Sequence, residues 1–224
     1  DPPKATAAAA IKRLEAAGIR VKIISGDAAP TVRHLVETLG VPARGLMTGA
    51  DIATLGATAL ALQAEKTDLF ARVSPDQKTR IIRALQARGH TVGFIGDGIN
   101  DAPALHAADV GLAVEGATEV ARAAADMIML ESDLGVVYDA VEEGRRTYAN
   151  IMKYLRMGTS SNFGNMLSMA VASLFIPFLP LTPVQVLLNN LFYDLSEVGI
   201  PYDKVERSII RRPHGLEMSE LLRF

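Results

Sequence analysis

The chain has 224 residues, 49% of them hydrophobic and 21% charged, and its formal net charge at pH 7 is −2. This length supplies apolar material for one large domain or two small ones, and the balanced, scattered charge argues against nucleic-acid binding. Cysteine is absent, which excludes disulfides and thiolate metal sites.

The chain starts with DPPK at 1–4 and continues into an alanine-rich helical run, without an initiating Met or a signal peptide. This start is typical of a segment taken from the middle of a longer protein. The first predicted strand follows at residues 21–24 and leads directly into Ser25, Gly26 and Asp27.

At the end of that strand, the hydroxyl of Ser25 is placed to hydrogen-bond a phosphoryl oxygen, and Gly26 permits close backbone approach. The same residues also fit an ordinary strand-to-helix turn in which Asp27 caps the next helix. Taken alone, this segment favours the ordinary turn.

A second strand is predicted over residues 69–73, followed by SPDQK at 74–78 as the start of an amphipathic helix. Lys78 offers a positive charge for a phosphate, although a helical lysine is more often a solvated surface charge. The phosphate hypothesis therefore requires that several strand ends converge.

At the end of the next predicted strand, residues 91–95, the chain reads GDGINDAPAL over 96–105 and continues as a helix. Its glycines allow a sharp turn, and its acidic and amide oxygens are ligands that Mg²⁺ prefers. The alternative is an acidic turn in which an aspartate caps the helix. The candidate Mg²⁺-site residues of this turn are Asp97, Asn100 and Asp101.

Residues 107–113, 116–124 and 126–130 alternate strand, helix and strand, which predicts a parallel sheet with flanking helices over 1–133. A helical pattern then continues over 134–156, with a glycine as its weak point. This stalk helix is expected to be continuous with the segment that follows.

Charged residues are absent over 157–193, and both 157–176 and 181–201 have about the length that crosses a hydrocarbon core. Basic residues flank this pair, so the positive-inside rule places both ends in the cytoplasm. The prediction is a transmembrane hairpin over 157–201 and a cytoplasmic tail over 202–224. A buried soluble helical hairpin is the alternative.

Polar residues fall at helical spacing within these two segments. Asn162 and Asn165 are three apart, and Asn190, Asp194 and Glu197 follow an i, i+4, i+7 stripe that is expected to face them. A carboxylate inside a membrane indicates an ion route, whereas hydrogen bonding between helices is the alternative for the amides. Prolines and a glycine nearby favour broken helices whose freed carbonyls add cation ligands.

Three segments resemble the P-type cation-transporting ATPases: SGD at 25–27, ARVSPDQK at 71–78 and GDGINDAPAL at 96–105. The resemblance covers essentially the whole chain. It implies the later part of a phosphorylation domain with a haloacid-dehalogenase-like fold, followed by the stalk and the fifth and sixth membrane helices.

Further segments, SSNFGN at 160–165, NNLFYD at 189–194 and IPYDKVE at 200–206, are most similar to the bacterial magnesium-importing branch. This similarity implies Mg²⁺ as the transported divalent cation and ATP as the substrate. It also implies a multi-pass location in the inner (plasma) membrane, in contact with lipid, with the α/β part in the cytoplasm.

The resemblance also assigns roles to single residues. Asp97 is implied as the principal ligand of the catalytic Mg²⁺, while Asn100 and Asp101 organise that site. Lys78 and Ser25 are implied to contact the phosphoryl group, and Gly26 and Asp27 complete the hinge-side motif. The implied transport-site residues are Asn162, Asn165, Asn190 and Asp194.

The aspartate nucleophile of the family lies in a DKTGT motif, which does not occur in this sequence. We therefore expect that the chain alone does not hydrolyse ATP and that it needs the missing N-terminal domains of the same pump. Two alternatives are a haloacid-dehalogenase-type phosphatase with a membrane anchor and a non-catalytic remnant that binds a membrane or a partner.

Overall fold

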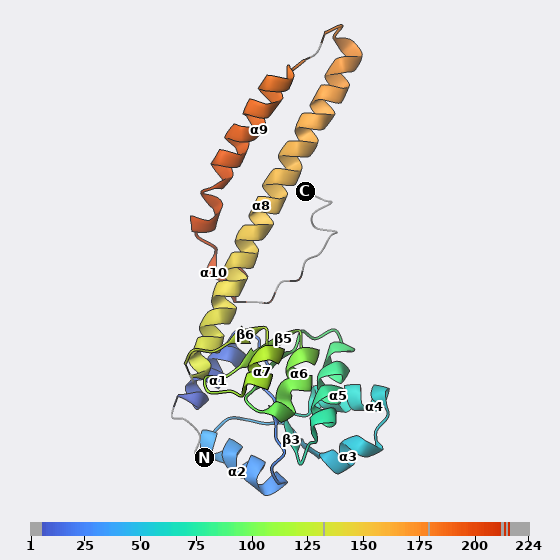
Figure 1. Cartoon of the computed structure of the whole chain (residues 1–224), viewed down its shortest axis with the longest axis vertical. Helices are drawn as coiled ribbons and strands as arrows, with labels where there is room; N and C mark the ends of the chain where they lie inside the picture. The colour runs from blue at the N-terminus through green and yellow to red at the C-terminus, as the bar shows by residue number, and fades with distance from the viewer. Residues whose placement is uncertain (1–5, 132, 179, 212, 214, 216–224) are drawn as a thin grey trace. The chain divides into compact units, whose positions relative to one another are not determined.

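The computed structural model of the chain describes residues 6–131, 133–178, 180–211, 213 and 215. The predicted start at 1–4 and most of the predicted tail beyond 211 lie outside these residues. The chain divides into two compact units, Asp1–Tyr138 and Asp139–Phe224 (Figure 1).

The strands of the first unit form two parallel three-stranded sheets. The first sheet has the order β1-β3-β2, so β3 is its central strand. Phe70 of β3 is paired with Ile24 of β1 on one side and with Met47 of β2 on the other. The second has the order β4-β5-β6. The prediction of a parallel α/β arrangement is confirmed, although the strands are shorter than predicted. Their bounds are β1 Ile23–Ile24, β2 Leu46–Thr48, β3 Leu69–Ala71, β4 Gly93–Gly96, β5 Val110–Ala113 and β6 Met127–Ile128.

Helices flank these strands, and local capping explains where several begin. Helix α5, which follows β3, starts with a capping box in which Ser74 and Gln77 each accept from the other's backbone N–H, and Pro75 occupies the first turn. The helices of this unit are α1 Ala7–Ala16, α2 Ala29–Leu39, α3 Gly49–Thr54, α4 Ala57–Lys66, α5 Pro75–Gln86, α6 Ala102–Ala107 and α7 Glu119–Ala124, together with the 3-10 helix η1 Ile99–Asp101.

The two sheets share one apolar interior. Strand β3 is buried throughout, with Phe70 and Ala71 fully inaccessible to solvent. Ile24 and Val92 pack against both the cluster around Phe70 and the cluster around Leu105. Packing of this kind fixes the ends of β1, β3 and β4 relative to one another.

The second unit consists mainly of α9, Pro183–Glu197, and of the part of α8, Leu134–Phe175, that follows Tyr138. Helix α8 runs through 42 residues, which confirms that the predicted stalk and the following segment are one helix. Helix α9 runs back beside α8 (Figure 1), and the short helices η2 Ile200–Tyr202 and α10 Arg207–Ile210 follow it.

Among the helices that the structure describes, none combines the length and the apolar character needed to cross a membrane. Helix α9 has 15 residues, or about 22 Å at 1.5 Å per residue, against a hydrocarbon core of about 30 Å. In the later part of α8, asparagine, serine and glycine residues interrupt the run of apolar side chains, although the helix itself is continuous. The transmembrane hairpin predicted over 157–201 is therefore not shown by the structure.

Candidate functional site

An open cavity of about 290 Å³ lies where β1 and β4 end and α5 begins. Because the strands of each sheet are parallel, their carboxyl ends carry the polar residues at one edge. The structure thus brings together residues from three separate predicted motifs. The site residues that line the cavity are Ser25, Gly26, Lys78, Asp97 and Asp101.

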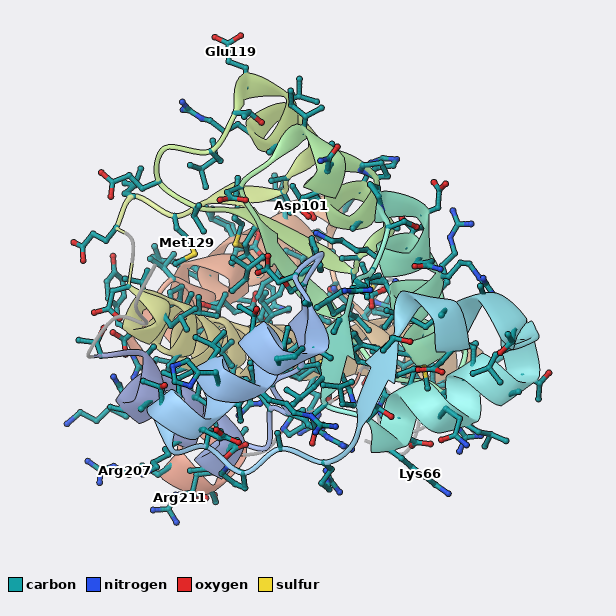
Figure 2. The ribbon with its side chains drawn as sticks, turned by 90° about the horizontal axis from the view of Figure 1, so that it is seen from below. Lys66, Asp101, Glu119, Met129, Arg207 and Arg211 are labelled. Carbon is teal, nitrogen blue, oxygen red and sulfur yellow. The ribbon has the colours of Figure 1, made fainter. Side chains whose placement is uncertain are left out.

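Lys78 and Asp101 form the charged centre of this cavity. The Lys78 Nζ donates to Asp101 Oδ1 at 2.6 Å, and both side chains are largely buried. In Figure 2, Asp101 lies among interior side chains, whereas Glu119 and Lys66 project from the periphery. Burial raises the pKa of the Asp101 carboxyl, but the hydrogen bond and charge of Lys78, together with the backbone N–H groups of Gly98 and Asp97, outweigh it and hold that pKa below its ordinary value.

The second oxygen of Asp101 is also engaged. Its Oδ2 accepts from the backbone N–H groups of Asp97 and Gly98, each at 3.3 Å. Asp101 occupies the N-cap position of α6, but its side chain does not cap that helix. Its carboxylate instead accepts from the N–H of Gly98, the N-cap residue of η1, and so closes the turn at the start of that 3-10 helix.

Asp97 lies at the end of β4 and is exposed to the cavity. Its backbone carbonyl accepts from the N–H of Thr118 at 3.0 Å, which fixes the backbone of the turn. Within the described part of the chain, no hydrogen bond reaches the Asp97 carboxylate. Its two oxygens are therefore available for a ligand, unlike those of Asp101.

Gly96 is required by the close approach of Asp101. A Cβ at position 96 would lie 2.7 Å from the Asp101 Cβ, a distance that real structures do not contain. The glycine therefore serves packing as well as turn formation. Asn100 is exposed on η1 and does not line the cavity.

Ser25 is held by the neighbouring strand segment and by a local turn. Its backbone N–H donates to the Phe70 carbonyl at 2.9 Å, and its carbonyl accepts from the Val73 N–H at 3.1 Å. Its Oγ donates to Asp27 Oδ2 at 2.9 Å and accepts from the Asp27 N–H at 3.0 Å. The N-cap of α2 is Ala28 and has no side-chain cap, so Asp27 does not cap that helix.

The four residues of the predicted transport site lie in the second unit. Asn162 is exposed and Asn165 half-buried on α8, while Asn190 and Asp194 are exposed on α9. No hydrogen bond joins any of these side chains to another in the described portions of α8 and α9. The buried member of the acidic stripe on α9 is instead Glu197.

Two features of the cavity were not predicted from the sequence. The first is the direct pairing of Lys78 with Asp101, whose residues are 23 apart in the chain. The second is the contact from Thr118, which lies in a segment without any motif. The expected convergence of strand ends was a signal for the pairing of Lys78 with Asp101. The sequence holds no signal for the contact from Thr118.

The cavity fits a divalent cation with a phosphate beside it. Mg²⁺ is commonly held by one or two carboxylates with waters and phosphate oxygens, and Asp97 offers both oxygens to open space. Groups of three or more His, Asp or Glu side chains arranged to hold a metal are absent from the described residues.

Comparison with known proteins gives a consistent result. Residues 1–109 match the haloacid dehalogenase-like hydrolase family. The whole chain is 50% identical to "Magnesium-transporting ATPase, P-type 1" of Escherichia coli K12, over 25% of that protein. It is 40% identical to "Probable cation-transporting ATPase F" of Mycobacterium bovis, over 95% of this chain and 24% of that protein.

The chain thus spans about a quarter of the length of the curated relatives that it matches. Among solved structures, it is similar to a zinc-transporting PIB-type ATPase in the E2.Pi state. The TM-score is 0.64 and the identity 24%, over 90% of this chain and 27% of that one. This last likeness shows the fold.

Proposed function

This chain belongs to the P-type ATPase family, and we propose that its parent protein is a pump that couples ATP hydrolysis to the import of Mg²⁺. The observation that carries the proposal is the convergence of Ser25, Lys78 and Asp97 on one cavity at the strand ends. The magnesium-transporting relatives, 50% identical over the whole chain, support the choice of ion.

In this proposal the cavity holds the phosphoryl group in transfer, together with a catalytic Mg²⁺. Asp97 is the ligand of the metal, because its carboxylate has no other partner in the described structure. Lys78 and the Ser25 hydroxyl stabilise the negative charge on the phosphoryl oxygens. Asp101 fixes Lys78 and the turn through its two engaged oxygens, and Asn100 supports that turn.

The nucleophile is not supplied by these residues. We propose that an aspartate from elsewhere in the parent pump enters the cavity and forms the aspartyl-phosphate. Strands β1 and β4 both line the cavity, and each pairs on one side only with a described strand. The chain by itself would then lack ATP hydrolysis, because the covalent step has no carboxylate to receive the phosphoryl group.

We also propose that residues 157–201 lie in the membrane of the assembled pump and contribute Asn162, Asn165, Asn190 and Asp194 to the transport site. The uncharged stretch over 157–193 supports this placement. So does the exposure of large apolar side chains, which is unusual for a surface in water. These include Phe163, Met166, Leu174, Phe175, Leu187, Leu191 and Phe192.

The test is Asp97→Asn in the full-length pump. The variant is expected to lower phosphoenzyme turnover by about 100-fold, because bound metal supplies several kcal/mol of transition-state stabilisation. Glu119→Gln is the matched control, since Glu119 is exposed at the start of α7. Turnover of labelled phosphoenzyme measures both variants, and wild-type turnover in Asp97→Asn would refute the assignment.

A further inference from the structure

Helix α9 buries one of its two acidic residues, Glu197, and exposes most of its apolar ones. Glu197 is 8% exposed and is the buried residue of this helix, whereas Leu187, Leu191 and Phe192 are 58–69% exposed. Charged side chains are almost never buried unless they are paired or bind a ligand. The position of Glu197 therefore calls for a partner.

Within the described residues, no hydrogen bond or ion pair reaches the Glu197 carboxylate. Its Oε1 is inaccessible to solvent and has no hydrogen bond in the described structure. A Cβ at Gly158 of α8 would lie 3.7 Å from this oxygen, so the carboxylate faces the α8 backbone where no side chain intervenes. Lys153, five positions before Gly158 on α8, is paired with Asp203 at 2.5 Å.

The end of α9 makes the same region more negative. Glu197 is the last residue of the helix, where unpaired carbonyls and the negative end of the dipole lie. A carboxylate in this place is repelled by the helix that carries it. A cation bound there would relieve both the repulsion and the unpaired oxygen.

A second unpaired acceptor lies further along the same pair of segments. Asn150 of α8 is 7% exposed, and its Nδ2 donates to the Pro201 carbonyl at 3.4 Å. Its Oδ1 is buried without a partner. The seam between α8 and the end of α9, defined by Asn150, Gly158, Glu197 and Pro201, thus contains two buried side-chain oxygens without a hydrogen bond in the described structure, Asn150 Oδ1 and Glu197 Oε1.

We propose that Glu197 contacts the transported divalent cation and that the ion passes along this seam. Asn150 would offer the next oxygen on that route. The inference rests on the proposed pump function and adds a residue outside the set Asn162, Asn165, Asn190 and Asp194. Oxygen ligands from a carboxylate, an amide and helix-end carbonyls suit a divalent cation that keeps some of its waters.

The experiment uses the full-length pump in lipid vesicles. MgATP is held constant on the side of the α/β unit, and free Mg²⁺ is varied on the opposite side, so that the catalytic metal does not change. Glu197→Gln is expected to raise the Mg²⁺ concentration for half-maximal ATP hydrolysis by about ten-fold, with the maximal rate changed much less. Glu197→Asp keeps the charge and should recover part of the loss. Glu206→Gln, an exposed carboxylate in the same unit, should match the wild type.

Phosphoenzyme formation from ATP verifies that each variant is folded. An unchanged half-maximal Mg²⁺ concentration in Glu197→Gln overturns the inference. The inference is also overturned if both Glu197 variants lower the maximal rate of ATP hydrolysis and leave the half-maximal Mg²⁺ concentration unchanged. That result would indicate that Glu197 has a structural role. Hydrolysis that ignores Mg²⁺ on the opposite side in the wild type, or in which Asp194→Ala changes nothing, overturns the pump function itself.

Discussion

Two aspartates four residues apart have different environments, and this separates their roles. Asp101 is buried, with one oxygen on Lys78 and the other on two backbone N–H groups. Asp97 is exposed to the cavity and keeps both carboxylate oxygens open. The same turn therefore provides one carboxylate that organises the site and one that can bind a metal.

The ion pair leads to a prediction about stability. Lys78→Met removes the cation beside a buried carboxylate, which costs about 1–3 kcal/mol in the free energy of unfolding at pH 7. Urea denaturation of the chain measures this loss. Lys66→Met is the control, because Lys66 is an exposed lysine at the end of α4, and it should change stability by less than about 0.5 kcal/mol.

The pH dependence of the same pair follows from the direction of the shift. The folded-state pKa of Asp101 lies below the unfolded value of about 3.9, so the ionised pair stabilises the fold above that pH. The contribution is lost as the pH falls through the folded-state pKa. In Lys78→Met, burial still raises the Asp101 pKa, but the cation that lowers it is gone. Acid unfolding of the variant should therefore begin at a higher pH than that of the wild type. Identical acid profiles would contradict the pairing.

Among the elements, those with a local signal were predicted and those that depend on distant partners were not. Helix α5 carries its capping box and apolar stripe in its own sequence, so its start was predicted from local residues. Strand β2 has three residues, and its pairing with β3 across 23 positions stabilises it. No periodic pattern fits within so short a strand, and it was missed.

The candidate site divides in the same way. Ser25, Lys78 and Asp97 could be selected because each follows an apolar strand, and the cavity brings them together. In the second unit, side-chain spacing on α9 predicted one common face, but burial reaches only Glu197 of the stripe Asn190, Asp194 and Glu197. Spacing along one helix does not determine how closely a neighbour packs at each turn.

Helix α8 is continuous through Gly144, and this yields a prediction for the element. The residue is exposed, and a Cβ there would meet no atom within 4 Å. Gly144→Ala should therefore stabilise the helix by about 0.5–1 kcal/mol, because glycine loses more backbone entropy in a helix. Thermal unfolding followed by circular dichroism measures the change.

Gly111→Ala is the contrasting control, because a Cβ at position 111 would lie 2.6 Å from the Leu105 carbonyl oxygen. This substitution should destabilise β5. Destabilisation by Gly144→Ala would instead mean that α8 requires a flexible point there. That outcome would argue against α8 acting as one rigid element.

At the scale of the whole molecule, the apolar core belongs to the first unit. The three buried clusters of the described chain draw all their members from residues 23–125. The second unit buries Ala149, Asn150, Met152 and Glu197 in the described residues. In the proposed pump, its stability is therefore expected to depend on other segments or on lipid.

This contrast predicts that residues 1–138 fold without the rest of the chain. The shortened chain keeps all three clusters and the contact of Arg13 over the Tyr138 ring, so it should show one cooperative urea transition. Leu105→Ala tests whether the same core is formed, because Leu105 is fully buried. The substitution should cost about 2–5 kcal/mol in both the shortened and the whole chain. A non-cooperative transition in residues 1–138, or a cost that differs between the two chains by more than about 1 kcal/mol, would show that the core needs residues beyond 138.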